Sequence, residues 1–449
     1  MTLPPPPAQP RAAAQPGAGD ARAAASDAAL DRHNARLRRS RLVYFVTVAV
    51  VVAALATFAA VAWSRGEAAH TTLRTVAHPP ASIGPARPVA APQQRWRSGD
   101  RLALGTPTTS GTVVTYSTHT VSGRNARTGA QTWSYTRTDR RVCNTIQLGA
   151  TAVAVYALHG DCDEVTALDV GTGARDWTRT LDEDGVTLNG AASYRWKSDT
   201  LLIYSPDAMY AIDPSTGLDR WTYRRYGCHT NAAVIGAAGA LISQNCPNPR
   251  CKGVKLCARG QQLVLRSATA GQLDTSKPNF DQFTWNDVGN SDVPLASASV
   301  ISALNRTTGE IDTFAPNNGR PVLSVGLQPA PALDSATLRS ATAVGTSDGA
   351  LAWIGGHTTV VQQNQPQPVW TTATTAAPTV LSDNDPAQLS NATITAPVAG
   401  AVVELDARTG KPAGHFPLAG LTSTGSDTRV FPLGTGFLVG TRTGTVDYQ

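Results

Sequence analysis

Cysteine is the residue type whose number and spacing most directly suggest chemistry in this chain. Six cysteines occur among the 449 residues, and they lie at Cys143, Cys162, Cys228, Cys246, Cys251 and Cys257. An even number of cysteines in a chain exposed to an oxidising compartment is typical of disulfides. Two intervals are nearly equal, because Cys162 follows Cys143 by 19 residues and Cys246 follows Cys228 by 18. This spacing favours those two pairs, each across strands of one repeat, and leaves Cys251 to pair with Cys257.

Two alternatives use the same cysteines. In the rival pairing, Cys228 joins Cys257 and Cys246 joins Cys251. A zinc site could also form from Cys246, Cys251 and Cys257 with His229, but the intervals of five and six residues differ from the usual spacing of two to four. We therefore expect disulfides and no metal site.

One short motif resembles a catalytic serine. Residues 345–349 read Gly-Thr-Ser-Asp-Gly, which matches the nucleophile elbow of hydrolases around Ser347. That chemistry requires a strand, a sharp turn and then a helix. The following residues, 350–354, have the composition of a strand, so we expect a hairpin turn here. The sequence predicts no catalytic and no cofactor-binding residue.

A repeated eleven-residue pattern dominates the rest of the chain. Residues 167–177 and 211–221 both read Ala-x-Asp-x-x-x-Gly-x-x-x-Trp, and a weaker copy ends 44 residues earlier at Trp133. A fixed period in this range indicates one supersecondary unit repeated along the chain. Asn or Asp followed by Thr-Gly or Ala-Gly favours a tight turn, so each copy predicts two strands joined by that turn.

This pattern of Ala, Asp, Gly and Trp resembles the repeat of the PQQ-type, or quinoprotein-like, β-propeller superfamily. The resemblance covers roughly residues 90–449. It implies that the Gly and Trp residues dock each four-stranded blade on its neighbour. The residues that match the family in this role are Gly129, Trp133, Gly173, Trp177, Gly217 and Trp221. Thr275, Thr313 and Gly414 occupy the Trp position of other copies, so we expect looser docking there.

The period predicts the number of blades and the way in which the ring closes. The positions that correspond to the Trp are 96, 133, 177, 221, 275, 313, 370 and 414. We therefore expect an all-β fold, an eight-bladed propeller of four-stranded antiparallel blades, with seven blades as the alternative. Residues 94–97 look like an outer strand, and the C-terminus offers three strands without an outer one. The N-terminal strand is thus predicted to complete the last blade.

The segment before the propeller has a different character. Residues 1–41 are predicted to be a disordered cytoplasmic tail and residues 64–92 an extended linker rich in Pro and Ala, before a propeller over residues 93–449. Residues 42–63 form an uncharged run of 22 residues, which is long enough for a transmembrane helix. A cleaved signal peptide is the alternative, but this run is longer than the usual apolar core of about 7 to 15 residues in such a signal. Arginines precede this run, so the positive-inside rule places the N-terminus in the cytoplasm and the propeller outside the cell membrane.

The charge distribution argues against nucleic acid as a partner. The first 41 residues carry seven Arg and three Asp, so they account for four of the six net positive charges. The remainder is nearly neutral and lacks the basic surface of a nucleic-acid-binding protein.

Three classes of function agree with these observations. The first is a non-enzymatic, single-pass membrane protein whose extracytoplasmic propeller acts as a scaffold for a protein or a cell-envelope partner. A further resemblance, to the propeller scaffolds of outer-membrane protein assembly, favours this class. The second is a PQQ-dependent dehydrogenase, and the third is a ligand-sensing ectodomain. The resemblance implies that such dehydrogenases hold PQQ with calcium ligands, a stacking Trp and a disulfide of adjacent cysteines. This chain has no adjacent cysteines, so we expect no cofactor. The weaker repeats between Gly217 and Trp370 are the predicted location of function.

Overall fold

The structure, a computed structural model, divides the chain into two units, Met1–His70 and Thr71–Gln449. It describes residues 39, 43–58, 67–105, 110–158, 160–181, 188, 192–197, 199–224, 227–246, 260–266, 281–286, 293–298, 300–346, 349–378, 393–421 and 428–449. In the first unit, residues 43–58 are helical and helix α2 spans Glu67–His70. No helix in these ranges has both the length and the apolarity needed to cross a membrane.

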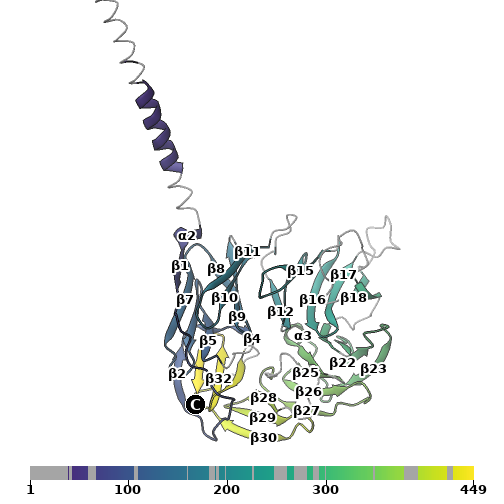
Figure 1. Cartoon of the computed structure of the whole chain (residues 1–449). Coiled ribbons are helices and arrows are strands. Elements are labelled where there is room, and N and C mark those ends of the chain that lie inside the picture. Colours follow the sequence, from purple (N-terminus) through teal and green to yellow (C-terminus); the bar gives the residue numbers. More distant parts are fainter. Residues whose placement is uncertain are drawn as a thin grey trace, which may run out of the picture. The chain divides into compact units, whose positions relative to one another are not determined.

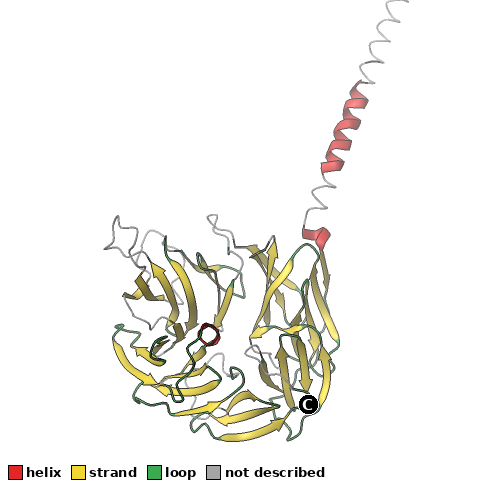
Figure 2. Ribbon diagram, turned by 180° about the vertical axis from the view of Figure 1, so that it is seen from behind, coloured by secondary structure: helices red, strands yellow, loops and turns green. Residues whose placement is uncertain are grey.

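The second unit is an all-β, eight-bladed β-propeller, which confirms the predicted fold class and excludes seven blades. Its strands form eight sheets that follow one another around a ring (Figure 1). We number the blades 1 to 8 in chain order, and the strands of each blade from the ring axis outwards. Seen from behind, strands again make up almost the whole ring (Figure 2).

The first four blades contain these strands: blade 1, β3 (Arg101–Leu102), β5 (Thr112–Tyr116), β6 (Thr120–Asn125) and β7 (Gln131–Arg137); blade 2, β8 (Arg141–Leu148), β9 (Thr151–Leu158), β10 (Asp161–Asp169) and β11 (Arg175–Thr180), with β4 (Leu104–Gly105) at its inner edge; blade 3, β12 (Ser193–Lys197), β13 (Thr200–Tyr204), β14 (Met209–Ile212) and β15 (Asp219–Tyr223); blade 4, β16 (His229–Gly236), β17 (Gly239–Cys246), β18 (Gly260–Arg266) and β19 (Asp281–Asn286).

The last four blades contain these strands: blade 5, β20 (Val293–Ser297), β21 (Ile301–Leu304), β22 (Glu310–Phe314) and β23 (Pro321–Gly326); blade 6, β24 (Thr342–Gly345), β25 (Gly349–Ile354), β26 (His357–Gln362) and β27 (Trp370–Ala373); blade 7, β28 (Thr393–Val398), β29 (Ala401–Asp406) and β30 (Pro412–Pro417); blade 8, β31 (Arg429–Leu433), β32 (Gly436–Thr441), β33 (Gly444–Tyr448) and β2 (Gln94–Ser98). Helix α3 (Ser335–Ser340) lies between β23 and β24 in sequence.

The N-terminal strand closes the ring, as the sequence predicted. Strand β2 pairs antiparallel with β33, and Trp96 stands opposite Asp447 in this ladder. Gln93 and Gln449 also exchange backbone hydrogen bonds of 2.9 and 2.8 Å. The last blade thus gains its outer strand from the start of the propeller, so the two ends of the ring hold each other.

Much of the segment predicted to be a linker is built into the propeller. Strand β1 (Thr71–Arg74) pairs antiparallel with β7 and becomes a fifth strand at the outer edge of blade 1. Ile83 is only 6% exposed and belongs to the core between blades 8 and 1. Strand β1 therefore covers the open edge of β7, and Ile83 fills core volume, so this part of the segment belongs to the propeller.

The core of the propeller lies between the blades. Each of the eight interfaces between neighbouring blades contains one cluster of buried apolar side chains. Because each blade packs on two neighbours, both faces of its strands are covered, and β5, β13 and β25 are buried at every position. This ring of interfaces positions the loops at its two faces.

Candidate binding face

The residues of the repeated pattern meet across the blade interfaces. Trp133 ends the pattern in blade 1, and its indole Nε1 donates a hydrogen bond of 2.8 Å to the backbone oxygen of Val170 in blade 2. Its ring lies against Gly173, where an added Cβ atom would come within 2.5 Å of Trp133 Cγ. Gly173 also has a φ of +74°, which an L side chain rarely adopts. Both properties explain why glycine occupies this position.

Three other interfaces repeat this arrangement. In each, the Trp Nε1 donates to the residue after the Asn or Asp of the next blade, and the Trp ring contacts the Gly of that turn. The pairs are Trp96 with Ala126 and Gly129, Trp177 with Pro214 and Gly217, and Trp370 with Ala407 and Gly410. We call each such contact an indole latch. Trp221 is buried beneath the guanidinium of Arg266, and its Nε1 has no hydrogen-bond partner among the described residues.

In blades 4 and 5, the strand register shows the Trp position of the pattern at other residues than the sequence period predicts. In complete copies, the Ala of the pattern faces the Trp across the two outer strands, as in the pair Ala167 and Trp177. Blade 4 places Trp285 in this position, opposite Leu263, and Trp285 Nε1 donates to Gly319 in blade 5. Blade 5 places Leu323 there, opposite Thr313. The assignment of Thr313 is therefore wrong, because the Asn305–Gly309 turn joins strands 2 and 3. Thr275 lies outside the described residues. The described strands of blade 4 show Trp285 at the Trp position, because the β18–β19 connection is longer than the fixed spacing.

The two faces of the ring carry different features. Strands 1 and 3 of a blade begin at one face, and strands 2 and 4 begin at the other, because successive strands are antiparallel. The turns of the indole latches with Gly129, Gly173 and Gly217 join strands 3 and 4, and the turn with Gly410 joins β29 to β30, the two outer strands described in blade 7. Trp370 lies at the start of β27, which is strand 4 of blade 6, so its latch with Gly410 lies at the same face as the other three. We call this the turn face. The opposite face carries the connections from one blade to the next and the turns between strands 2 and 3.

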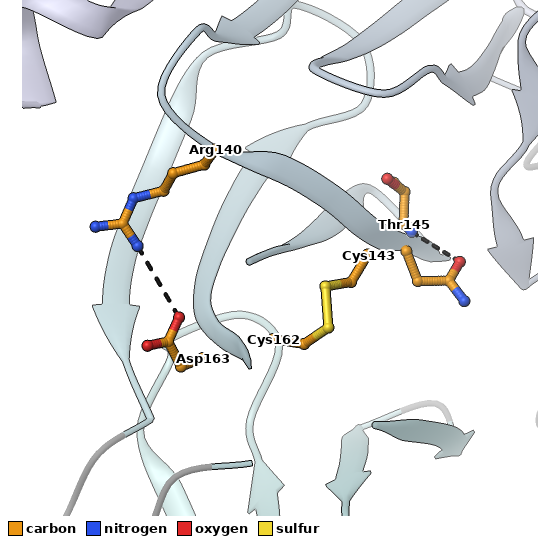
Figure 3. Close-up of a disulfide and its surroundings, with 6 residues drawn as sticks. Arg140, Cys143, Thr145, Cys162 and Asp163 are labelled. Atoms are coloured by element: carbon orange, nitrogen blue, oxygen red, sulfur yellow. Dashed lines mark hydrogen bonds and ion pairs between the residues drawn. A yellow bond between two sulfur atoms is a disulfide. The ribbon is translucent and has the colours of Figure 1, made fainter. Parts of the chain in front are cut away.

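Both disulfides of the described residues lie at this opposite face, which we call the disulfide face. Cys143, near the start of β8, bonds to Cys162, near the start of β10 (Figure 3). Cys228, just before β16, bonds to Cys246 at the end of β17. These are the two pairs that the spacing favoured, although the first spans strands 1 and 3 and the second joins strands 1 and 2. The rival pairing, in which Cys228 joins Cys257 and Cys246 joins Cys251, is excluded because Cys228 and Cys246 are bonded to each other. The zinc site is excluded for the same reason, since it needs Cys246 as a ligand. Cys251 and Cys257 lie outside the described residues.

A buried cluster of charges lies beside the first disulfide. Arg137, only 1% exposed, forms an ion pair across the interface with Glu164 in blade 2 and another of 3.0 Å with Asp139. Arg140 contacts Glu164 at 3.1 Å and Asp163 at 4.0 Å, and the latter contact appears in Figure 3. Burial alone lowers the pKa of Arg137, but the hydrogen bond to Asp139 and the charge of Glu164 hold this pKa above its usual value. The cluster therefore fixes blades 1 and 2 to each other at the disulfide face.

A polar pocket of about 790 Å³ opens at the disulfide face, near the first strands of blades 8, 1, 2 and 3. Five arginines contribute to its lining: Arg101, Arg141, Arg195, Arg429 and Arg442. Tyr116, Tyr194, Asn144 and the disulfide of Cys143 and Cys162 also line it, whereas no Asp or Glu of the described residues does. A second hollow of about 340 Å³ shares Arg101, Arg429 and Arg442 with it.

This location differs from the one that the sequence suggested. The weaker repeats between Gly217 and Trp370 supply none of the residues that line the pocket. The sequence analysis missed the arginines, because they come from four blades and have no common spacing. Their only shared signal is a position near the start of a first strand or in the turn after a second strand.

Two other predicted features can be located. Ser347 lies outside the described residues, but β24 ends at Gly345 and β25 begins at Gly349. Strands therefore flank the motif on both sides, as in a hairpin, where a nucleophile elbow needs a following helix. Groups of three or more His, Cys, Asp or Glu side chains suited to a metal ion do not occur within the part of the chain that the structure describes.

The residues of the pocket do not fit PQQ with its calcium ion. Calcium prefers carboxylate and carbonyl oxygen ligands. The described lining instead presents five guanidinium groups, which repel a cation. Its disulfide joins cysteines 19 residues apart, in contrast to the adjacent pair that the quinoprotein resemblance implies.

Structural comparison aligns this chain with several solved structures. Among solved structures, the computationally designed Ika8 protein aligns with a TM-score of 0.49 and 13% identity, over 83% of this chain and all of its own. BamB from Moraxella catarrhalis aligns with a TM-score of 0.41 and 14% identity, over 75% of this chain and 96% of its own. A europium-containing methanol dehydrogenase aligns with a TM-score of 0.44 and 12% identity, over 78% of this chain and 84% of its own. A search of curated proteins found no match.

A protein-family model gives the more specific assignment. The model described as outer membrane protein assembly factor BamB matches residues 86–312, which is just over half of the chain. The matched range runs from the segment before β2 to β22, and it includes the indole latches of Trp96, Trp133 and Trp177. The chain therefore belongs to the family described as outer membrane protein assembly factor BamB.

Proposed function

We propose that the protein is a non-enzymatic, membrane-anchored scaffold that presents its disulfide face to a protein or cell-envelope partner. One observation carries this proposal: both described disulfides and the arginine-lined pocket lie at the same face of the ring. The indole latches hold the ring together from the turn face. The loops of the disulfide face can therefore differ in sequence while the blades beneath them stay rigid. Variable loops on a rigid frame are the usual arrangement of a binding surface.

The family assignment supports the same function. Its description names an outer membrane protein assembly factor. A scaffold needs a stable surface more than a reactive group. The bonds at the disulfide face provide such stability, because the disulfide of Cys143 and Cys162 and the ion pairs of Arg137 hold three strands of two blades.

The location of this scaffold follows from its N-terminal segment. The uncharged run over residues 42–63 follows the arginine-rich end of residues 1–41. We infer a single membrane crossing with the N-terminus in the cytoplasm and the propeller outside. Disulfides in the propeller agree with an extracytoplasmic domain, because oxidising compartments favour them.

A dye-linked oxidation assay tests the enzymatic alternative. The full-length protein, mixed with PQQ and calcium, should oxidise no alcohol and show no bound-cofactor absorbance. Alcohol oxidation above that of a sample without PQQ would contradict the non-enzymatic function and support a dehydrogenase. The scaffold function itself is tested by photo-crosslinking from the disulfide face in intact cells.

A further inference from the structure

We propose that the arginine-lined pocket of the disulfide face binds a compact anion that carries several phosphate or carboxylate groups. This site goes beyond the scaffold function and does not depend on it. The charge of the pocket, the hydrogen-bond partners of its arginines and its size all favour such a ligand.

The charge of the pocket is strongly one-sided. Arg101, Arg141, Arg195, Arg429 and Arg442 converge from four blades, and the described lining contains no carboxylate. Like charges that converge in a partly enclosed space repel one another, and an anion bound among them relieves this repulsion. Folding alone gives no reason to gather five positive charges at this place.

The arginines of the pocket differ from other arginines of the ring in their partners. Arg124 pairs with Asp100, and Arg179 pairs with Asp219 at 2.7 Å. In the pocket, Arg101 Nε donates to the backbone oxygen of Arg442 at 3.2 Å, and Arg195 donates to that of Tyr194 at 2.8 Å.

Ion pairs are absent from most of these pocket arginines. Within the described ranges, no carboxylate lies in ion-pair distance of Arg101, Arg141, Arg195 or Arg442. Two acidic residues next to the pocket in sequence are already engaged, because Asp100 pairs with Arg124 and Asp163 contacts Arg140. The pocket therefore keeps its positive charge.

Neutral donors complete the site. Tyr194 lines the pocket and is only 8% exposed, yet its hydroxyl has no hydrogen-bond partner among the described residues. Burial raises the pKa of this hydroxyl, with a smaller contribution from Tyr116, so it stays protonated and can donate.

The size of the pocket limits the ligand. A volume of about 790 Å³ lies within the usual range for small-molecule sites. Guanidinium groups bind phosphate and carboxylate oxygens in pairs, which gives both affinity and orientation. A ligand with two or more such groups could engage arginines of different blades together.

Isothermal titration calorimetry of the full-length protein in a neutral detergent tests this site. Tripolyphosphate and citrate serve as the phosphate and carboxylate probes, at low salt. We expect at least one of them to bind at a single site, and the stronger binder identifies the preferred group. The double variant R141Q/R442Q should weaken this binding by about tenfold or more, because each lost charged hydrogen bond is worth more than 1.4 kcal/mol.

The double variant R127Q/R320Q is the matched control. Arg127 and Arg320 lie in turns between strands 3 and 4, at the turn face, and both are exposed. This control removes the same charge, so its affinity should stay within twofold of the parent protein. If R141Q/R442Q lowers the thermal midpoint, the single change R195Q replaces it. Absence of binding at millimolar concentrations of both probes, or equal weakening in both double variants, would overturn the proposal.

Discussion

The indole ring of Trp133 in blade 1 lies so close to Gly173 in blade 2 that only glycine fits there. A Cβ atom at position 173 would stand 2.5 Å from Trp133 Cγ, and Trp133 Nε1 holds the same turn through Val170. The Gly and the Trp of one repeat therefore act in different interfaces. Each Trp latches onto the turn of the next blade, and each Gly receives the Trp of the blade before.

The change Gly173→Ala should destabilise the ring through both strain and overlap. The positive φ costs about 1–2 kcal/mol for an alanine, and the overlap with Trp133 adds about 1–3 kcal/mol. Gly149→Ala is the matched control, because Gly149 has a φ of +59° but nothing within 4 Å of an added Cβ. Thermal unfolding should show a clearly larger loss for Gly173→Ala. Equal losses for both variants would mean that the latch contributes nothing.

Trp285, which stands at the corrected Trp position of blade 4, makes a second prediction. Trp285→Phe keeps a ring but removes the hydrogen bond to Gly319, so it should lower stability by about 0.5–1.5 kcal/mol for that bond, besides the loss of ring area. Trp133→Phe, which removes the corresponding bond in blade 1, is the reference. Similar shifts of the thermal midpoint in the two variants would mean that Trp285 stabilises its interface as Trp133 does. An unchanged midpoint for Trp285→Phe, together with a lowered one for Trp133→Phe, would contradict this role of Trp285.

Trp133 and Trp285 show how far the sequence alone predicts the fold. Trp133 and Trp177 stand at regular spacing, and the ring, its eight blades and its closure by β2 follow from that period. Trp285 does not follow from it, because the connection between β18 and β19 is longer and carries no pattern. The arginine-lined pocket also escaped sequence analysis. Its arginines become neighbours only when blade 8 meets blade 1, and no local pattern encodes that contact.

The ion pair of Arg137 and Glu164 predicts a large effect for removal of one charge. Glu164→Gln leaves the buried guanidinium with Asp139 and should cost about 3 kcal/mol of unfolding free energy. Glu404→Gln is the control, because Glu404 has no ion pair among the described residues and burial raises its pKa. The double change R137M/E164L should recover much of the loss. A Glu164→Gln variant as stable as Glu404→Gln would contradict a structural role for the pair.

Asp447 makes the stability of the ring depend on pH. This residue faces the closing strand β2, and burial raises its pKa to about 7, against the hydrogen bond from Gln449 and the charge of Arg95. The folded protein thus binds a proton that the unfolded chain releases near its ordinary pKa of 3.8. Between about pH 4 and pH 7, stability should fall as pH rises, by up to about 1.4 kcal/mol per pH unit.

Asp447→Asn should remove this slope, and its thermal midpoint should exceed that of the parent protein above pH 7. Asp406→Asn is the control of opposite sign. Hydrogen bonds from Thr409 lower the pKa of Asp406, so its carboxylate stabilises the fold above about pH 4 and this stability is lost in acid. Parallel pH profiles of midpoint for Asp447→Asn and the parent protein would contradict the assignment.

Site-specific photo-crosslinking in intact cells tests the central claim, that the disulfide face is the contact surface of a scaffold. A photoreactive residue replaces Thr118 or Thr443, which are exposed in turns between strands 2 and 3 at that face, or Thr128, which is exposed at the turn face. We predict discrete adducts with a protein or envelope polymer from positions 118 and 443, and much weaker ones from position 128. No adduct from positions 118 and 443, or equal adducts from all three, would contradict the account.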